Sequence, residues 1–230
     1  IETLAITGYE KKPTGRKGEL DTLREHEFEE IERQINDGDR YHHITYQLAE
    51  DCLQAALLAR GLERSRSDVD SLFDRAERIA AKVGYARQKI RILYERAWTA
   101  YWWYNDFAEL SQLYDTIEPL ALGQDIVNIG KLFNLHTVLA ACVRAGEFSS
   151  TEAKIEQRTA AIRVDLDQIA ADGNRPNSAL QARTKLKFLD IQSAIYAGAP
   201  PDPHFNELKA ILTQTEGLSS YPVESTTEII

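Results

Sequence analysis

The hydrophobic positions of the chain recur at steps of three and four residues, which is the spacing of one face of an α-helix. The clearest case is the stretch 86–120, whose apolar positions are Ile90, Leu93, Ala97, Tyr101 and Tyr104 before a short break and Phe107, Leu110, Tyr114 and Ile117 after it. Asp106 and Glu109 have the spacing of a capping box for the second helix. Because a turn this short joins antiparallel helices, the pattern predicts a helical hairpin.

The same periodicity predicts seven further helices. Their expected limits are about 19–35, 39–60, 67–83, 125–145, a helix after residue 149 that ends near 173, 178–197, and a short helix that begins at 202. Ser67 and Ser149 are the expected caps of two of them, and Asn36 to Gly38 is an expected stop. Since no segment shows strand alternation with hairpin turns, the prediction is an all-α fold of stacked antiparallel hairpins.

The first predicted helix has an apolar side that we expect to face the core, and an opposite side rich in glutamate. The apolar side consists of Leu20, Leu23, Phe28, Ile31 and Ile35. The predicted helix at 125–145 is apolar over a wider arc than any other. We expect it to be covered on more than one side, because a helix with so wide an apolar surface is normally buried.

The ends of the chain differ in composition from its centre. Residues 1–18 combine glycine and proline with a basic cluster, so we expect a linker or strap from an upstream region that is missing. Residues 19–216 form the expected helical-repeat domain, and the Ser-, Thr- and Glu-rich residues 217–230 a flexible tail. The chain contains no methionine and begins with Ile1, which predicts a fragment of a longer protein whose enzymatic part, if any, lies elsewhere.

Charge and cysteine content exclude several classes of partner. The net charge of −9 argues against binding to nucleic acid and to anionic membranes, since both need an excess of lysine and arginine. The longest apolar runs, such as residues 138–143, are too short to span a bilayer. Cys52 and Cys142 lie on apolar helical faces, so we expect two buried thiols and a reducing, cytoplasmic setting.

The central hairpin resembles a tetratricopeptide repeat. Tyr101 matches the large residue near the end of the first helix of such a repeat, and residues 105–107 match its Gly-Asp-Tyr turn. Residues 110, 114 and 117 fall where the second helix carries Ala, an aromatic residue and Ala, and the turn at 146–148 resembles a second copy. The segment 72–84 is similar to the second helix of divergent repeats in large signalling ATPase regulators. The resemblance implies a right-handed tetratricopeptide-like α-solenoid.

The sequence departs from that family at two points. Trp98 and Leu139 stand where the family has a small residue. The glycine stops at 84, 123 and 173 are 39 and then 50 residues apart, whereas the repeat is about 34 residues long. A generic helical solenoid explains the same pattern.

In a stack of such repeats the first helices line the concave surface, which is where a peptide or protein partner binds. The family register therefore implies a partner-binding groove. Its residues are Glu95, Thr99, Trp102, Trp103, Phe133, His136 and Arg144, with Ile92 and Ala140 also facing it. The helical wheel independently directs Trp102 and Trp103 away from the main apolar face. The alternative is that a neighbouring helix covers both indoles.

Candidates for catalysis or metal binding are few. His26 and Glu30 share a helix face, and His42 follows Asp39 at the spacing of a ligand pair. However, Glu30 lies in an acidic run typical of a solvated face, and the chain contains no His-Glu-x-x-His, Cys-x-x-Cys or Gly-x-Ser-x-Gly motif. We therefore predict no catalytic residues, metal or cofactor.

The favoured function is a non-catalytic module that binds a protein or peptide, as the sensing or scaffolding part of a larger intracellular signalling protein. The alternative is a helical-bundle metal protein or enzyme that uses His26, Glu30 and His42. Self-association through an exposed helix is a third possibility.

Overall fold

The computed structural model describes residues 19–40 and 45–214. These residues fall into two compact units, which meet in the sequence at residues 120 and 121. All regular secondary structure in the described ranges is helical, with no strand. The predicted all-α class is therefore confirmed.

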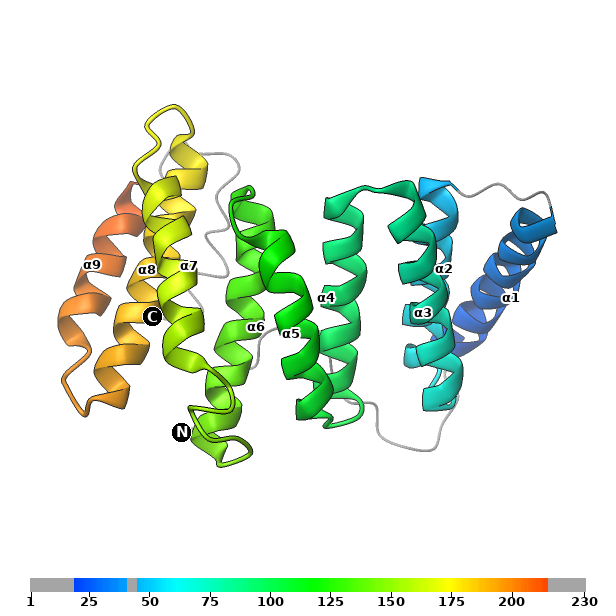
Figure 1. The fold of residues 1–230 in the computed structure, drawn as a ribbon, viewed down its shortest axis with the longest axis horizontal. Helices are drawn as coiled ribbons and strands as arrows, with labels where there is room; N and C mark the ends of the chain where they lie inside the picture. The colour runs from blue at the N-terminus through cyan, green and yellow to red at the C-terminus, as the bar shows by residue number, and fades with distance from the viewer. Residues whose placement is uncertain (1–18, 41–44, 215–230) are drawn as a thin grey trace. The chain divides into compact units, whose positions relative to one another are not determined.

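The first unit contains five helices. They are α1 (Glu19–Arg40), α2 (Tyr46–Gly61), α3 (Arg66–Val83), α4 (Ala86–Trp102) and α5 (Phe107–Ala121). Successive helices run in opposite directions, and α2 packs on α1 and α3 (Figure 1). Helix α4 packs on α3 and also touches α2, so alternate helices of the unit are in contact.

The second unit contains four helices. They are α6 (Ile126–Ala145), α7 (Ile155–Ala170), α8 (Pro176–Tyr196) and α9 (Asp202–Thr213). Each packs on the next along the chain, and α6 also contacts α8. The contact of α6 with α8 parallels that of α2 with α4 in the first unit, since both join alternate helices.

Small side chains bring α2 close to its neighbours. Ala49, Ala55, Ala56 and Ala59 are fully buried on this helix, together with Cys52. Alanine and cysteine occupy little volume, so the backbone of α2 can approach α1 and α3 on two sides. Cys142 is also buried, and neither thiol forms a disulfide, as predicted. Burial raises the pKa of Cys142 to about 11.

Helix α6 is buried over most of its circumference. Leu132, Leu135 and Leu139 are buried on it, and so are Ile129 and Phe133. Both α7 and α8 contact α6, which explains why the apolar arc is wider than one neighbour would need. The prediction that this helix is covered on more than one side is confirmed.

The predicted helix limits are wrong at three places in the chain. Helix α1 continues through the expected stop at 36–38 and ends at Arg40, and α2 begins only at Tyr46. An isolated glycine costs a helix only about 1 kcal/mol, so it does not have to end one. The side chain that caps α3 is Ser65, which accepts a hydrogen bond from the amide of Asp68, and not Ser67.

The third wrong limit concerns α7. Ser149 and Glu152 do form a capping box, in which each side chain accepts a hydrogen bond from the other residue's amide. The turn that they stabilise is not continuous with α7, because Lys154 has a left-handed backbone with φ of +50°. The helix begins after it, at Ile155.

The apolar side of α1 is only partly buried. Phe28 and Ile35 are in the core, whereas Leu20 and Leu23 are each 67% exposed, contrary to the prediction. The guanidinium of Arg64, just beyond the end of α2, lies 4.0 Å from the centre of the Phe28 ring. The first turns of α1 therefore expose Leu20 and Leu23 to solvent, although Asp21 between them is buried.

Candidate partner-binding surface

The seven predicted groove residues belong to two units. Glu95, Thr99, Trp102 and Trp103 are in the first unit, and Phe133, His136 and Arg144 are on α6 in the second. The two sets are therefore described separately. Together, these positions remain a prediction for a partner-binding surface.

Arg60, at the end of α2, organises the first set. Its side chain is only 6% exposed, and its Nη1 donates a hydrogen bond of 2.9 Å to Oγ1 of Thr99. The same nitrogen lies 3.8 Å from Oε2 of Glu95. The guanidinium also lies over the ring of Trp103, 4.2 Å from its centre. One buried cation thus holds three of the four predicted residues.

These contacts decide what the first set can offer to a partner. Thr99 is buried, and its hydroxyl donates a hydrogen bond to the carbonyl oxygen of Glu95. Since Arg60 already engages Thr99 and Glu95, both side chains serve the contact between α2 and α4. Trp102 and Trp103 are half-buried. Part of each indole and part of Glu95 therefore remain accessible, although Nε1 of Trp102 is itself buried.

Trp102 belongs to a row of aromatic rings along α4. Its ring stacks on Trp98 at 6.3 Å with an angle of 11° between planes, and Tyr94 contacts Trp98 edge-on at 5.9 Å. Tyr101 lies edge-on to Trp102 at 4.9 Å. The spacing of four residues places Tyr94, Trp98 and Trp102 on one stripe of the helix. Trp98 is buried, so this large residue is accommodated where the tetratricopeptide pattern has a small one.

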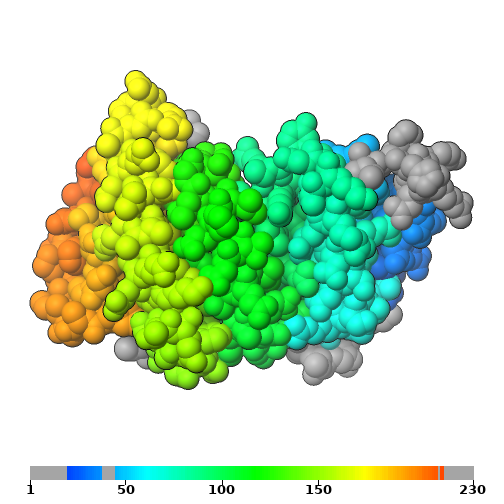
Figure 2. Space-filling model, in the orientation of Figure 1, coloured from blue at the N-terminus to red at the C-terminus, as the bar shows by residue number. Residues whose placement is uncertain are grey.

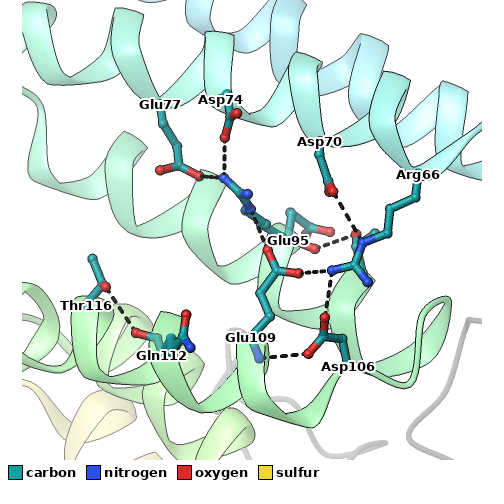
Figure 3. Close-up of polar contacts among 11 residues, drawn as sticks. Arg66, Asp70, Asp74, Glu77, Glu95, Asp106, Glu109, Gln112 and Thr116 are labelled. Atoms are coloured by element: carbon teal, nitrogen blue, oxygen red, sulfur yellow. Dashed lines mark hydrogen bonds and ion pairs between the residues drawn. The ribbon is translucent and has the colours of Figure 1, made fainter.

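The first unit also contains a polar network that the sequence did not indicate. Figure 3 shows Arg66 of α3 pointing toward Asp106 and Glu109, at the start of α5. Nη2 of Arg66 lies 2.7 Å from a carboxylate oxygen of each. In the space-filling view, the cyan side chains of α3 and the green ones of α5 meet on the visible face (Figure 2). The network therefore ties α3 to α5 across α4.

Glu109 is the bridge of this network. Its other carboxylate oxygen accepts a hydrogen bond of 3.0 Å from Nε of Arg96 on α4, which also pairs with Asp74 and Glu77 of α3. Burial alone would lower the pKa of Arg96, but hydrogen bonds to Glu77 and Asp74 outweigh it and raise that pKa. One carboxylate thus joins two cations on different helices.

The network also changes the predicted capping box of α5. Asp106 does cap the helix, since its Oδ1 accepts a hydrogen bond of 3.0 Å from the amide of Glu109. That bond, and then the one from Arg66, hold the pKa of Asp106 below its usual value. The side chain of Glu109 binds Arg66 and Arg96, which lie outside the expected box. The local spacing therefore predicted correctly that Asp106 caps the helix. It did not predict that the side chain of Glu109 binds two arginines from other helices.

The second set consists of two buried residues and one exposed residue. Phe133 is buried, with the ring of Phe188 at 6.5 Å and Nζ of Lys185 at 4.8 Å from its centre. Arg144 is exposed, and its guanidinium lies 5.8 Å from the centre of the Tyr196 ring. We call this line of contacts between the two helices the α6/α8 seam; it comprises Gly130, Phe133, Ala140 and Arg144 of α6, and Lys185, Phe188 and Tyr196 of α8.

His136 is 1% exposed, and its hydrogen bond identifies its tautomer. Oγ1 of Thr159 lies 3.0 Å from Nε2 of His136, but the hydroxyl proton of Thr159 is donated to the carbonyl oxygen of Ile155 at 2.7 Å. Nε2 must therefore carry the imidazole proton and donate it to Thr159. Burial, and then the nearby charge of Arg158, lower the pKa of His136 to about 4. The imidazole is neutral at pH 7.

The candidates for a metal site are not brought together. His26 and Glu30 lie 4.0 Å apart on α1, and both are largely exposed. His42 lies outside the described residues, and so does the side chain of Asp39. Within the part of the chain that the structure describes, no group of three or more His, Cys, Asp or Glu side chains is placed to hold a metal ion.

A hollow of about 410 Å³ lies between α7, α8 and α9. Its charged side chains pair among themselves: Asp190 lies 2.7 Å from Arg163 and 3.2 Å from Lys187, which also pairs with Glu207. Arg183 and Asp167 complete the charged lining, which therefore contains three cations and three anions. This balance gives the hollow no preference for either sign of charge.

Helix α6 satisfies the length and composition of a membrane-spanning helix, with a mean hydropathy of 1.5 over its best window. The sequence-based prediction considered only uninterrupted apolar runs, and it missed α6 because polar residues interrupt the apolar residues of this helix. Of that window, 61% is buried within the structure, as in the core helix of a globular domain. Length and composition do not distinguish these two roles.

Comparison of the chain with protein-family models, with curated proteins and with solved structures found no match in any of the three.

Proposed function

We propose that this chain is a non-catalytic helical-repeat module that binds a protein or peptide through the face of α4 that carries Trp102 and Trp103. In this proposal the hairpins stack as a tetratricopeptide-like, right-handed α-solenoid. The module serves as the sensing or scaffolding part of a larger intracellular signalling protein. The arrangement of neighbours within each unit supports stacking, since α2 touches α4 and α6 touches α8.

The observation that carries the proposal is the pair of half-buried indoles at the end of α4. Tryptophan is frequent among the residues that dominate binding energy at protein interfaces. Both rings are held in place before any partner arrives, Trp103 by the buried guanidinium of Arg60 and Trp102 by the stacked ring of Trp98. An anchor that is already ordered loses little conformational entropy on binding.

The roles of the two indoles can be separated. Trp103 covers Arg60, so Trp103→Ala removes a contact of a buried cation and should lower stability as well as binding. Trp102 contacts neighbouring rings of its own helix and no buried charge among the described residues, so Trp102→Ala should lower the melting temperature less than Trp103→Ala and leave the chain folded. Trp102 is therefore the cleaner test of a binding role.

The experiment uses peptides selected on the whole chain from a displayed library of random peptides. We expect the selected peptides to bind Trp102→Ala at least tenfold more weakly than the unaltered chain, which corresponds to about 1.4 kcal/mol. Tyr85→Ala is the matched control, since Tyr85 is an exposed aromatic residue at the other end of α4 and should have no effect. Equal binding by both variants, or unfolding of Trp102→Ala, would overturn the assignment.

A further inference from the structure

Lys185 is a lysine in the α6/α8 seam whose ammonium group contacts a ring and no acid. The side chain is half-buried, and its Nζ lies 4.8 Å from the centre of the Phe133 ring. Its Cε lies 3.5 Å from the position that a Cβ would take at Gly130. Within the described residues, no carboxylate lies within ion-pair distance of this Nζ. The group is therefore partly removed from water without a counter-charge.

Lys187, on the same helix, is a natural comparison. Its Nζ lies 3.2 Å from Oδ2 of Asp190 and pairs with Glu207 as well. The hydrogen bond to Glu207 is the largest of several effects that raise the pKa of Lys187. Two lysines two residues apart thus have opposite environments: one is stabilised as a cation by carboxylates, and the other is desolvated beside a ring.

Desolvation has a chemical consequence for Lys185. Because burial disfavours the charged form, it lowers the pKa of Lys185 to about 8. At pH 7.5 roughly a quarter of such amines are neutral, whereas an ordinary lysine is neutral in roughly one molecule in a thousand. Only the neutral amine has a lone pair with which to attack an electrophile.

We propose that Lys185 is a modification site that accepts acyl groups from activated acyl donors, namely acyl phosphates and acyl thioesters. Nζ attacks the carbonyl carbon, and a nitrogen–carbon bond forms as the carbon–oxygen or carbon–sulfur bond breaks. The leaving group departs as phosphate or thiolate, and the amine releases a proton to solvent. The product is a neutral amide.

Acylation would change the α6/α8 seam. The amide has no positive charge, so it loses the attraction of the ammonium group for the face of Phe133. It is also larger, and the lysine side chain runs close to the backbone of α6, since a Cβ at Gly130 would lie only 3.5 Å from its Cε. Acylation of Lys185 would therefore alter the packing of α6 against α8 in the second unit.

The test treats the whole purified chain with acetyl phosphate and measures the acetylation rate at each lysine by mass spectrometry. We expect Lys185 to react on the order of tenfold faster than Lys187 and than the exposed Lys209, because its larger neutral fraction outweighs its lower nucleophilicity and partial burial. Its rate should rise with pH and level off above about 8. Acetyl-coenzyme A, as the thioester probe, should give the same order. A rate at Lys185 no higher than at Lys209 would overturn the proposal.

A matched pair of variants tests the cause. The Cβ position of Gly130 lies 3.8 Å from Nζ of Lys185, so Gly130→Asp places a carboxylate beside the amine, and Gly130→Asn places a neutral group of the same shape. We expect Gly130→Asp to slow acetylation of Lys185 about tenfold while Lys209 is unaffected, and Gly130→Asn to slow it much less. Equal rates in the two variants, with both folded by circular dichroism, would contradict desolvation without a counter-charge as the origin of the reactivity.

Discussion

The contact between α2 and α4 and the α6/α8 seam are equivalent places in the two units, but they hold their cations differently. Between α2 and α4, Arg60 faces Glu95, and Arg91 pairs with Glu50. In the α6/α8 seam, Lys185 and Arg144 lie over aromatic rings, and no carboxylate of the described residues pairs with either. The cations of the first contact are paired with carboxylates, whereas those of the second are not and remain available for reaction or binding.

The pairing of two helices therefore does not by itself determine whether the cations between them are paired with carboxylates. Both contacts join alternate helices, and both include aromatic rings. A carboxylate next to a buried guanidinium provides a fixed structural pair, and removal of either partner is costly. A lysine that is desolvated without a counter-charge, such as Lys185, holds its proton less tightly.

Arg60→Ala should cause the largest loss of stability, about 3 kcal/mol, because it leaves Glu95 without its buried partner and Trp103 without the group beneath it. The three tryptophans of the chain all lie in residues 98–103, so tryptophan fluorescence during urea unfolding reports on the first unit. Arg91→Ala, which removes a more exposed ion pair, is the control and should cost less than about 1 kcal/mol. Equal effects of the two would mean that burial of Arg60 is not what matters.

Acid should destabilise the second unit through His136. Its pKa is about 4 in the folded state and 6.5 as the ordinary value, so between these values the unfolded chain binds more protons than the folded one. The contribution of His136 to the free energy of unfolding is therefore fully present above pH 6.5. It falls by at most about 3 kcal/mol as the pH decreases toward 4. Circular dichroism melts across this range measure the loss.

His136→Gln provides the control for this pH dependence. The amide nitrogen of glutamine can donate to Thr159 as Nε2 of the imidazole does, but it does not titrate. The variant should therefore lose the part of the pH dependence that lies between 4 and 6.5. If its melting temperature falls with pH as steeply as that of the unaltered chain, another group is responsible.

Glu109→Gln should have a moderate effect, about 1–2 kcal/mol, because the partly buried bridge between Arg66 and Arg96 loses its charge while its shape is kept. Asp74→Asn removes a half-exposed carboxylate from Arg96 and should cost less than about 0.5 kcal/mol. Urea unfolding followed by tryptophan fluorescence compares them. A larger loss for Asp74→Asn would place the centre of the network on α3 and not at Glu109.

Arg144→Ala should have the smallest effect, within about 0.5 kcal/mol, since an exposed guanidinium over Tyr196 contributes little. Circular dichroism melting at pH 7 measures it. Tyr196→Phe should cost more, because the hydroxyl of Tyr196 donates a hydrogen bond of 2.7 Å to the carbonyl oxygen of Ala140. The reverse order would show that the cation, and not the hydroxyl, holds this end of the α6/α8 seam.

Much of the fold could be predicted because its signals are local. The cap at Asp106 and the glycine that ends α3, Gly84 with φ of +84°, are encoded within a few residues of where they act. The candidate site was less predictable. Helical spacing indicated Trp102 and Trp103, and the structure shows both to be half-buried. The same spacing could not indicate that Thr99 and His136 are buried. Burial depends on which neighbour lies opposite, and periodicity carries no information on that.

The helical class, the buried thiols and most helix limits follow from the order of the amino acids, because periodicity and capping involve residues one turn apart. The packing of the helices brings Arg60 to Thr99, which is 39 residues away, and Lys185 to Phe133 without a carboxylate of the described residues nearby. The tertiary arrangement also leaves Leu20, on the apolar side of α1, exposed. The physical reason is that helix pairing fixes which side chains face one another across the gap between two axes, and that choice depends on the lengths and offsets of both helices.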